Sequence, residues 1–135
     1  MPAQSPIYLV DDDADFLEIE KAIFQSGGFQ VACFPDPPAA LLALRASVLA
    51  GERPLVVCDL MMRSLDSGFT LARSIKEDPQ LNMVPVVIVS AIASQKGFDF
   101  HPRTPADLAA MHADAFFDKP VSPERLLAKV VELLR

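Results

Sequence analysis

Three short runs of this chain are almost entirely apolar, and they limit the possible folds more than any other feature. They occupy residues 7–10, 55–58 and 86–89. A strand with one face in water alternates apolar and polar residues, whereas a strand covered on both faces need not alternate. The runs therefore predict inner strands of a sheet that helices cover on both sides. Weaker apolar runs at 29–34 and 115–117 predict two more strands.

Segments with helical spacing of apolar residues separate these runs. In the first, Phe16, Ile19, Ile23 and Phe24 are expected to share the buried face, and the glycines at 27–28 predict its end. Four more helices are expected to begin near residues 36, 68, 104 and 122. Alternating strands and helices predict parallel strands joined by right-handed crossovers. The expected fold is a doubly wound α/β fold with a five-stranded parallel sheet and five helices.

Length and charge restrict the class of protein further. The chain has 135 residues, of which 51% are apolar, so we expect one domain over residues 1–135 with an N-terminal tail at 1–6. Its formal net charge of -6 disfavours binding to nucleic acid or to an anionic membrane surface. With neither a secretory signal nor an apolar run long enough to span a bilayer, a cytoplasmic protein is expected. Cys33 and Cys58 are expected to be buried free thiols.

Polar residues follow the expected inner strands where each strand ends. These residues are Asp11, Asp12 and Asp13 after the first strand, Asp59 after the third, Ser90 after the fourth, and Asp118 and Lys119 after the fifth. The carboxyl ends of a doubly wound sheet converge on one crevice. Neighbouring carboxylates repel each other, so a site that keeps them ionised needs a cation, and oxygen ligands favour Mg²⁺. A carboxylate there can also attack phosphorus, while a metal, a lysine and a hydroxyl neutralise the transferred group.

The strand ends resemble those of a known family, the receiver domains of two-component response regulators. The resemblance extends from Ile7 to Leu134 and rests on four segments that occur in the family's order. These segments are residues 10–13, 57–62, 89–91 and 116–120. The resemblance implies a flavodoxin-like sheet with strand order 2-1-3-4-5.

The same resemblance implies a role for each acid. Asp59 would be the phosphoacceptor of a phosphorelay. Asp12 and Asp59 would bind Mg²⁺ directly, together with the backbone carbonyl of Met61, and Asp11 would act mainly through bound water. The protein would be a phosphorylation-controlled switch that catalyses only its own phosphoryl transfer and slow dephosphorylation.

Three further residues have roles by this resemblance. Ser90 and Lys119 would contact oxygens of the phosphoryl group, and Phe116 would be the aromatic switch residue that turns inward when Ser90 moves. The phosphodonor would be a histidine kinase or a histidine phosphotransfer protein, and the output would be binding to a downstream protein partner. Because receivers often dimerise, the resemblance leaves open whether this chain forms a homodimer.

The chain departs from the family's pattern at several positions. Arg63 stands where the family usually has proline, the glycine at position 68 is displaced by one, and extra residues fall around 95–105. The apolar residues Met61 and Ile92 lie where the family's hydrolytic water approaches. Because apolar groups offer that water no hydrogen bond, slow self-dephosphorylation is expected.

Two other interpretations explain the acids less completely. A phosphohydrolase of the haloacid dehalogenase type would use the Asp11/Asp13 pair, but that family expects threonine or valine where Asp15 stands. Asp13 and Asp15 are more simply explained as acids that cap the first helix or lie in its first turn, and Asp118 as a solvated loop carboxylate. A degenerate receiver that only binds proteins is disfavoured by the complete set of acids.

Overall fold

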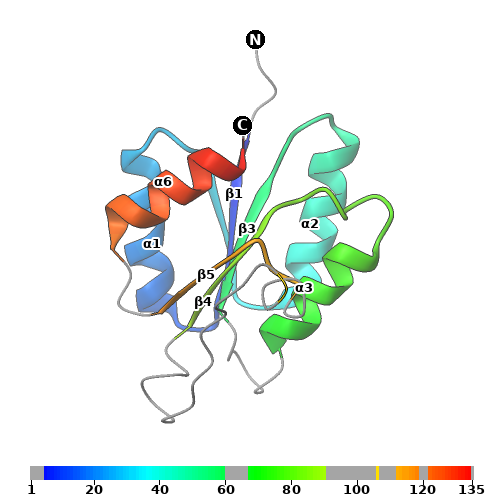
Figure 1. Ribbon diagram of the computed structural model, residues 1–135, viewed down its shortest axis with the longest axis horizontal. Coiled ribbons are helices and arrows are strands. Elements are labelled where there is room, and N and C mark those ends of the chain that lie inside the picture. Colours follow the sequence, from blue (N-terminus) through cyan, green and yellow to red (C-terminus); the bar gives the residue numbers. More distant parts are fainter. Residues whose placement is uncertain (1–4, 60–66, 91–105, 107–111, 119–121, 135) are drawn as a thin grey trace.

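A five-stranded parallel sheet forms the centre of the protein (Figure 1). The computed structural model describes residues 5–59, 67–90, 106, 112–118 and 122–134. The strands are β1 (Ile7–Val10), β2 (Val31–Phe34), β3 (Leu55–Asp59), β4 (Val86–Ser90) and β5 (Ala115–Asp118). Their order in the sheet is β2-β1-β3-β4-β5, so the order implied by the sequence is confirmed.

Helices cover both faces of the sheet. Figure 1 shows α1 (Ala14–Ser26) and α6 (Pro123–Leu133) on one side, and α2 (Pro37–Leu49) and α3 (Ser67–Glu77) on the other. The expected helix near residue 104 falls almost wholly outside the described residues, of which Ala106 is helical. Within the described part of the chain, no helix has both the length and the apolar composition that crossing a membrane requires.

The inner strands are buried on both faces, as their unbroken apolar runs predict. Successive side chains of each strand enter two different apolar clusters. Leu9 and Val57 pack with α1 and α6, whereas Val10 and Cys58 pack with α2 and α3. The protein therefore has two apolar core layers, one on each face of the sheet.

Side-chain caps begin three of the helices where the sequence predicts them. Asp13 caps α1, Asp36 caps α2 and Ser122 caps α6, and each side chain accepts a hydrogen bond from a backbone N–H of the first turn. Proline occupies the first turn of α2 and α6, where its missing N–H costs nothing. These caps fix where each connecting loop ends.

The buried face of α1 differs from the prediction. Leu17, Glu20 and Phe24 face the sheet, whereas Ile19, which was expected in the core, is 56% exposed. The expected face was chosen from apolar residues alone. The helix is in fact rotated so that a charged residue lies between two apolar ones on its inner side.

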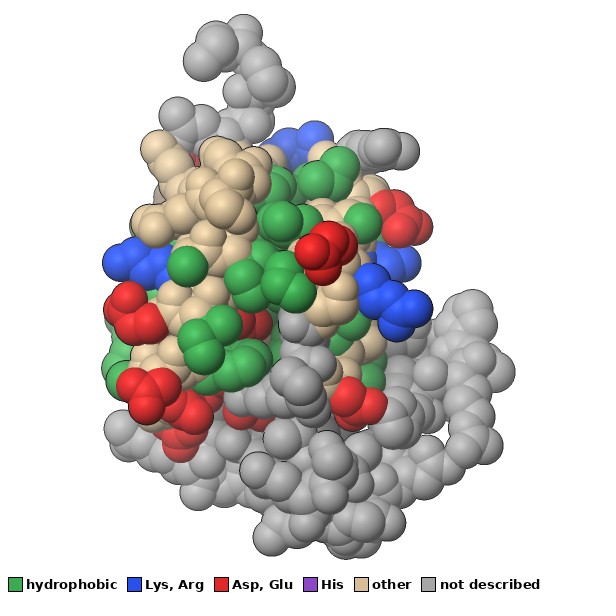
Figure 2. Space-filling model, turned by 90° about the vertical axis from the view of Figure 1, so that its left-hand side faces the viewer, with side chains coloured by type: hydrophobic (Ala, Val, Ile, Leu, Met, Phe, Trp, Pro, Cys, Tyr) green, Lys and Arg blue, Asp and Glu red, His purple; other side chains and the backbone are tan. Residues whose placement is uncertain are grey.

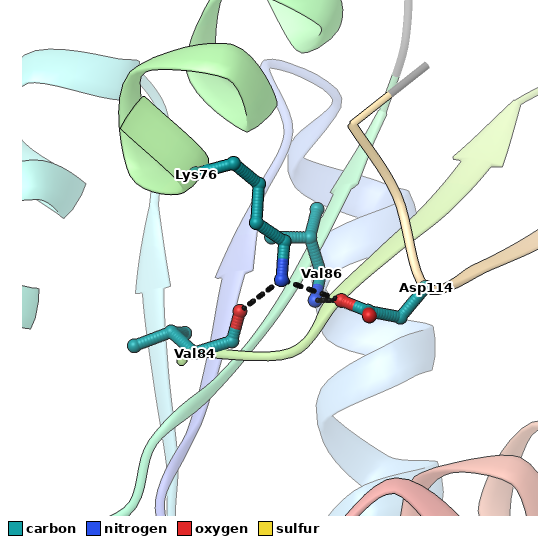
Figure 3. Close-up of polar contacts among 4 residues, drawn as sticks. All are labelled: Lys76, Val84, Val86 and Asp114. Atoms are coloured by element: carbon teal, nitrogen blue, oxygen red, sulfur yellow. Dashed lines mark hydrogen bonds and ion pairs between the residues drawn. The ribbon is translucent and has the colours of Figure 1, made fainter. Parts of the chain in front are cut away.

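A hydrogen-bonded clamp joins α3 to the amino-terminal ends of β4 and β5 (Figure 3). Lys76 Nζ donates to the Val84 carbonyl oxygen and to Asp114 Oδ2, both at 2.8 Å. Asp114 Oδ2 also accepts from the Val86 N–H at 2.8 Å, and the Asp114 N–H donates to the Val86 carbonyl oxygen at 2.7 Å. One carboxyl oxygen therefore holds three separate segments together.

Removing that carboxyl should destabilise the fold. We expect Asp114→Ala to lower the free energy of unfolding by about 1–3 kcal/mol, because the Val86 N–H and the Lys76 ammonium both lose their acceptor. Urea unfolding followed by circular dichroism measures the change. The control is Glu77→Gln, whose partner Arg73 lies 3.9 Å away at the exposed surface, and which should change the free energy by less than about 0.5 kcal/mol. Equal effects for the two variants would contradict the clamp.

Candidate functional site

The carboxyl ends of the inner strands meet at the lower edge of the sheet in Figure 1. Val10 pairs with Cys58, Asp59 pairs with Val89, and Ser90 pairs with Asp118. Continuing the first pairing by one residue places Asp11 beside Asp59. Residues that are far apart in the sequence therefore come together at one edge, in the crevice where doubly wound sheets bind ligands.

Two of these acids are buried. The exposed fraction is 2% for Asp11 and 9% for Asp59, whereas Asp12 is exposed. The Asp13 N–H donates to Asp11 Oδ1 at 2.9 Å, and the Asp11 N–H donates to the Phe34 carbonyl oxygen at 3.1 Å. These bonds fix the orientation of Asp11 at the end of β1.

Asp13 has a structural role at the start of α1. Its Oδ1 atom accepts hydrogen bonds from the N–H groups of Asp15 and Phe16, at 3.0 and 3.2 Å. The interpretation of Asp13 as a helix cap is confirmed. The dehalogenase-type alternative, which needs Asp13 as an acid for catalysis, is not supported.

A third buried carboxyl, Glu20 of α1, was missed by the sequence analysis. Its signal was its spacing from Leu17 and Phe24, which places the three on one helical face. Burial raises the pKa of the Cys58 thiol, and the negative charges of Asp59, Glu20 and Asp11 raise it further. The end of β3 thus lies in a negative potential, which favours a bound cation.

The structure describes the other predicted site residues only in part. Met61 and Lys119 lie outside the described residues, and for Ser90 the structure describes only the backbone at the end of β4. Phe116 lies on β5, half-buried against the apolar cluster of α2 and α3. Asp118 ends β5 and has one buried carboxyl oxygen, so its interpretation as a solvated loop residue was wrong.

The donor set at this edge fits Mg²⁺. Among the described residues, no three His, Cys, Asp or Glu side chains are grouped so that they could hold a metal ion by themselves. Mg²⁺ does not require one, because it is usually held by one or two carboxylates together with waters and the oxygens of a substrate phosphate. Asp59, Asp12 and Asp11 supply hard oxygen donors of this kind, and Cys58 points to the other face of the sheet.

Acidic side chains also gather at the lower end of the face formed by α1 and α6 (Figure 2). The exposed acids Asp12 and Asp13 lie between β1 and α1, and exposed Asp15 lies in the first turn of α1. Because this surface is negative, it repels a free anion and favours an approach in which a cation is already bound.

A cavity of about 200 Å³ lies at the opposite end of the sheet. Val48, Pro54, Met83 and Pro85 are among its lining residues, near the amino-terminal ends of β3 and β4. Among its lining residues, only Glu52 and Arg53 carry a charge. It is therefore separate from the acidic site.

The two cysteines differ in their exposure. Both are free thiols, as predicted, and Cys58 is buried, but Cys33 is exposed on the edge strand β2, which corrects the expectation that both are buried.

We expect a thiol reagent at neutral pH to modify the folded protein only at Cys33. Burial raises the pKa of Cys58, so that the thiol stays protonated as well as inaccessible. Mass spectrometry after alkylation measures the number of modified thiols, and Cys33→Ser should leave none until urea unfolds the chain. Rapid alkylation of Cys58 in the folded Cys33→Ser protein would contradict this account.

Comparison with known proteins identifies the family. The model of the response regulator receiver domain matches residues 7–131. The transcriptional regulatory protein GltR of Pseudomonas aeruginosa is 30% identical over 132 residues, which cover 96% of this chain and 48% of that protein. The transcriptional regulatory protein FixJ of Bradyrhizobium diazoefficiens is 30% identical over 137 residues, covering 100% of this chain and 59% of FixJ. The chain thus spans about half the length of these relatives.

Solved structures agree on the fold. A putative response regulator from Chloroflexus aurantiacus has a TM-score of 0.77 at 20% identity, covering 98% of both chains. The chemotaxis protein CheY4 of Vibrio cholerae has a TM-score of 0.75 at 20% identity, covering 98% of this chain and all of that one. This chain belongs to the response regulator receiver domain family. Receiver domains are signalling switches of two-component systems.

Proposed function

We propose that this chain is a single receiver domain that accepts a phosphoryl group on Asp59 in a Mg²⁺-dependent reaction. The observation that supports it best is the burial of Asp59 and Asp11 at the carboxyl ends of β3 and β1, which pair in parallel up to Val10 and Cys58. The donor would be a histidine kinase or a histidine phosphotransfer protein.

The transfer would use the geometry of the strand ends. A carboxylate oxygen of Asp59 attacks the phosphorus of a phosphohistidine, an O–P bond forms, the P–N bond breaks, and the imidazole nitrogen keeps the electron pair. Asp12, Asp59 and the carbonyl of Met61 would hold Mg²⁺, with Asp11 acting through water. The ion would neutralise charge on the transferred group. Ser90 and Lys119 would contact the phosphoryl oxygens.

Strand β4 would relay the event to the surface. Ser90 ends β4, and Ile88 of the same strand pairs with Phe116 on β5. A displacement of Ser90 would therefore be transmitted to Phe116 through these two adjacent strands. It would shift the equilibrium between two conformations of a surface that a downstream protein binds. The relatives GltR and FixJ are named as transcriptional regulators, so an output in transcription is one form that this partner would take. A cytoplasmic location of the chain would suit a histidine kinase or a histidine phosphotransfer protein as the phosphodonor.

Incubation with Mg²⁺ and acetyl phosphate should add one phosphoryl group to the wild-type chain, and Asp59→Asn should abolish the addition. Intact-mass spectrometry under mild conditions measures it. The control Asp15→Asn, an exposed acid in the first turn of α1, should leave the extent of phosphorylation unchanged. Labelling that survives in Asp59→Asn but disappears in Asp11→Asn would contradict the proposal and favour a phosphohydrolase.

The phosphorylated protein should lose its phosphoryl group slowly, with a half-life of minutes or longer in Mg²⁺ buffer. By the family resemblance, Met61 and Ile92 would lie on the path of the attacking water, and their apolar side chains would give it no hydrogen-bond partner. Release of inorganic phosphate after removal of the donor measures the rate, and Met61→Asn should accelerate it. A half-life of seconds in the wild type would show the expectation to be wrong.

A further inference from the structure

A glutamate occupies the middle of the buried face of α1. The side chain of Glu20 is 3% exposed and lies between Leu17 and Phe24, which belong to the apolar cluster beneath α1 and α6. An apolar residue at this position would pack against the sheet without the desolvation that a buried carboxylate requires. No step of the proposed phosphoryl transfer uses this carboxylate. Its burial therefore needs an explanation other than packing.

Asp11 and Asp59 lie on the face of the sheet that α1 covers. Side chains alternate along a strand, so Asp59 of β3 faces the same side as Val57, which packs with α1 and α6. Asp11 faces the same side as Leu9, because the hydrogen bond from its N–H to the Phe34 carbonyl oxygen continues the pairing of β1 with β2. Both acids and the inner face of α1 are thus on one side of the sheet.

The direction of α1 brings the carboxyl of Glu20 toward these two acids. The helix begins at Ala14, next to the carboxyl end of β1, and runs back along the sheet (Figure 1). Side chains of a helix lean toward its amino-terminal end, so a long side chain reaches back over the preceding turn. For Glu20 this direction leads to the edge of the sheet where Asp11 and Asp59 lie.

The electrostatics of the neighbouring thiol agree with this placement. Burial is the largest cause of the raised pKa of Cys58, and the negative charges of Asp59, Glu20 and Asp11 follow in that order. Cys58 directly precedes Asp59 in β3. The charge of Glu20 therefore acts at the end of β3 as well as the charge of Asp11 does.

Burial also determines how strongly such a charge acts. Salt screens the interactions of exposed charges, whereas buried charges are screened much less. Three carboxylates on one covered face consequently repel one another in an environment of low dielectric constant. That repulsion is relieved when a divalent cation binds among them.

We propose that Glu20 is an auxiliary carboxylate of the cation site, which strengthens Mg²⁺ binding through its charge and not as a direct ligand. This inference rests on the proposed function, because the ion is the one that Asp12 and Asp59 would hold. Glu20 then sets the Mg²⁺ concentration at which the site becomes ready for phosphoryl transfer.

Isothermal titration calorimetry with Mg²⁺ tests the role of the charge. Glu20→Gln keeps the size of the side chain and removes its charge, so it should raise the dissociation constant about three- to tenfold. The matched control is Glu18→Gln, the same substitution at an exposed position of α1. It should change the constant by less than about twofold at physiological salt, because solvent and ions screen an exposed charge.

Two further variants separate the charge from the packing. Glu20→Leu places an apolar side chain on an apolar face and should weaken Mg²⁺ binding as much as Glu20→Gln does. Glu20→Asp retains the charge and should stay closer to the wild type. The rise in melting temperature that Mg²⁺ causes should follow the same order. Each variant is compared with its own metal-free form, so a change in the stability of the fold itself does not affect this order.

Asp59→Asn distinguishes a failure of this inference from a failure of the proposed function. It should weaken Mg²⁺ binding more than Glu20→Gln does, because Asp59 would be a ligand as well as a charge. A wild type that binds no Mg²⁺, or undiminished binding in Asp59→Asn, would overturn the proposed function and this inference together. Wild-type affinity in Glu20→Gln, or an equal loss in Glu18→Gln, would overturn the inference alone.

Discussion

The parallel pairing of β1, β3 and β4 is the constraint on which the site depends. Side chains of a strand alternate between the two faces, so a slip of one residue would turn Asp59 from one face of the sheet to the other. The register is fixed because each inner strand fills two apolar clusters at once. A slip would also move Cys58 and Val57 into each other's clusters. The packing of the core therefore determines which carboxyls meet at the edge.

The second constraint is electrostatic. Asp11, Asp59 and Glu20 are buried close to the same strand end, where negative charges are costly without a counter-charge. Hydrogen bonding of Asp11 to the Asp13 N–H offsets part of that cost, and a divalent ion would offset more. Repulsion between these carboxylates favours the binding of a divalent cation. The bound cation would then offset the negative charge of an added phosphoryl group.

Much of this was predictable from the sequence, for physical reasons. Unbroken apolar runs indicated strands covered on both faces, and the caps Asp13, Asp36 and Ser122 marked where helices begin. Glu20 was missed because the buried face of α1 was chosen from apolar residues alone, and the same choice placed the exposed Ile19 in the core. The clamp of Lys76 and Asp114 was missed because it joins residues 38 positions apart. The site residues Met61 and Lys119 lie outside the described residues and stay predictions.

The most direct test is the position of a divalent ion in crystals grown with Mn²⁺ as a substitute for Mg²⁺. Anomalous scattering distinguishes the ion from an ordered water molecule. Our account predicts one ion at the carboxyl ends of β1 and β3, with oxygens of Asp12 and Asp59 at bonding distance, about 2.1–2.3 Å. An ion bound elsewhere, or an Asp59 carboxyl that points away from Asp11 and Asp12, would contradict it.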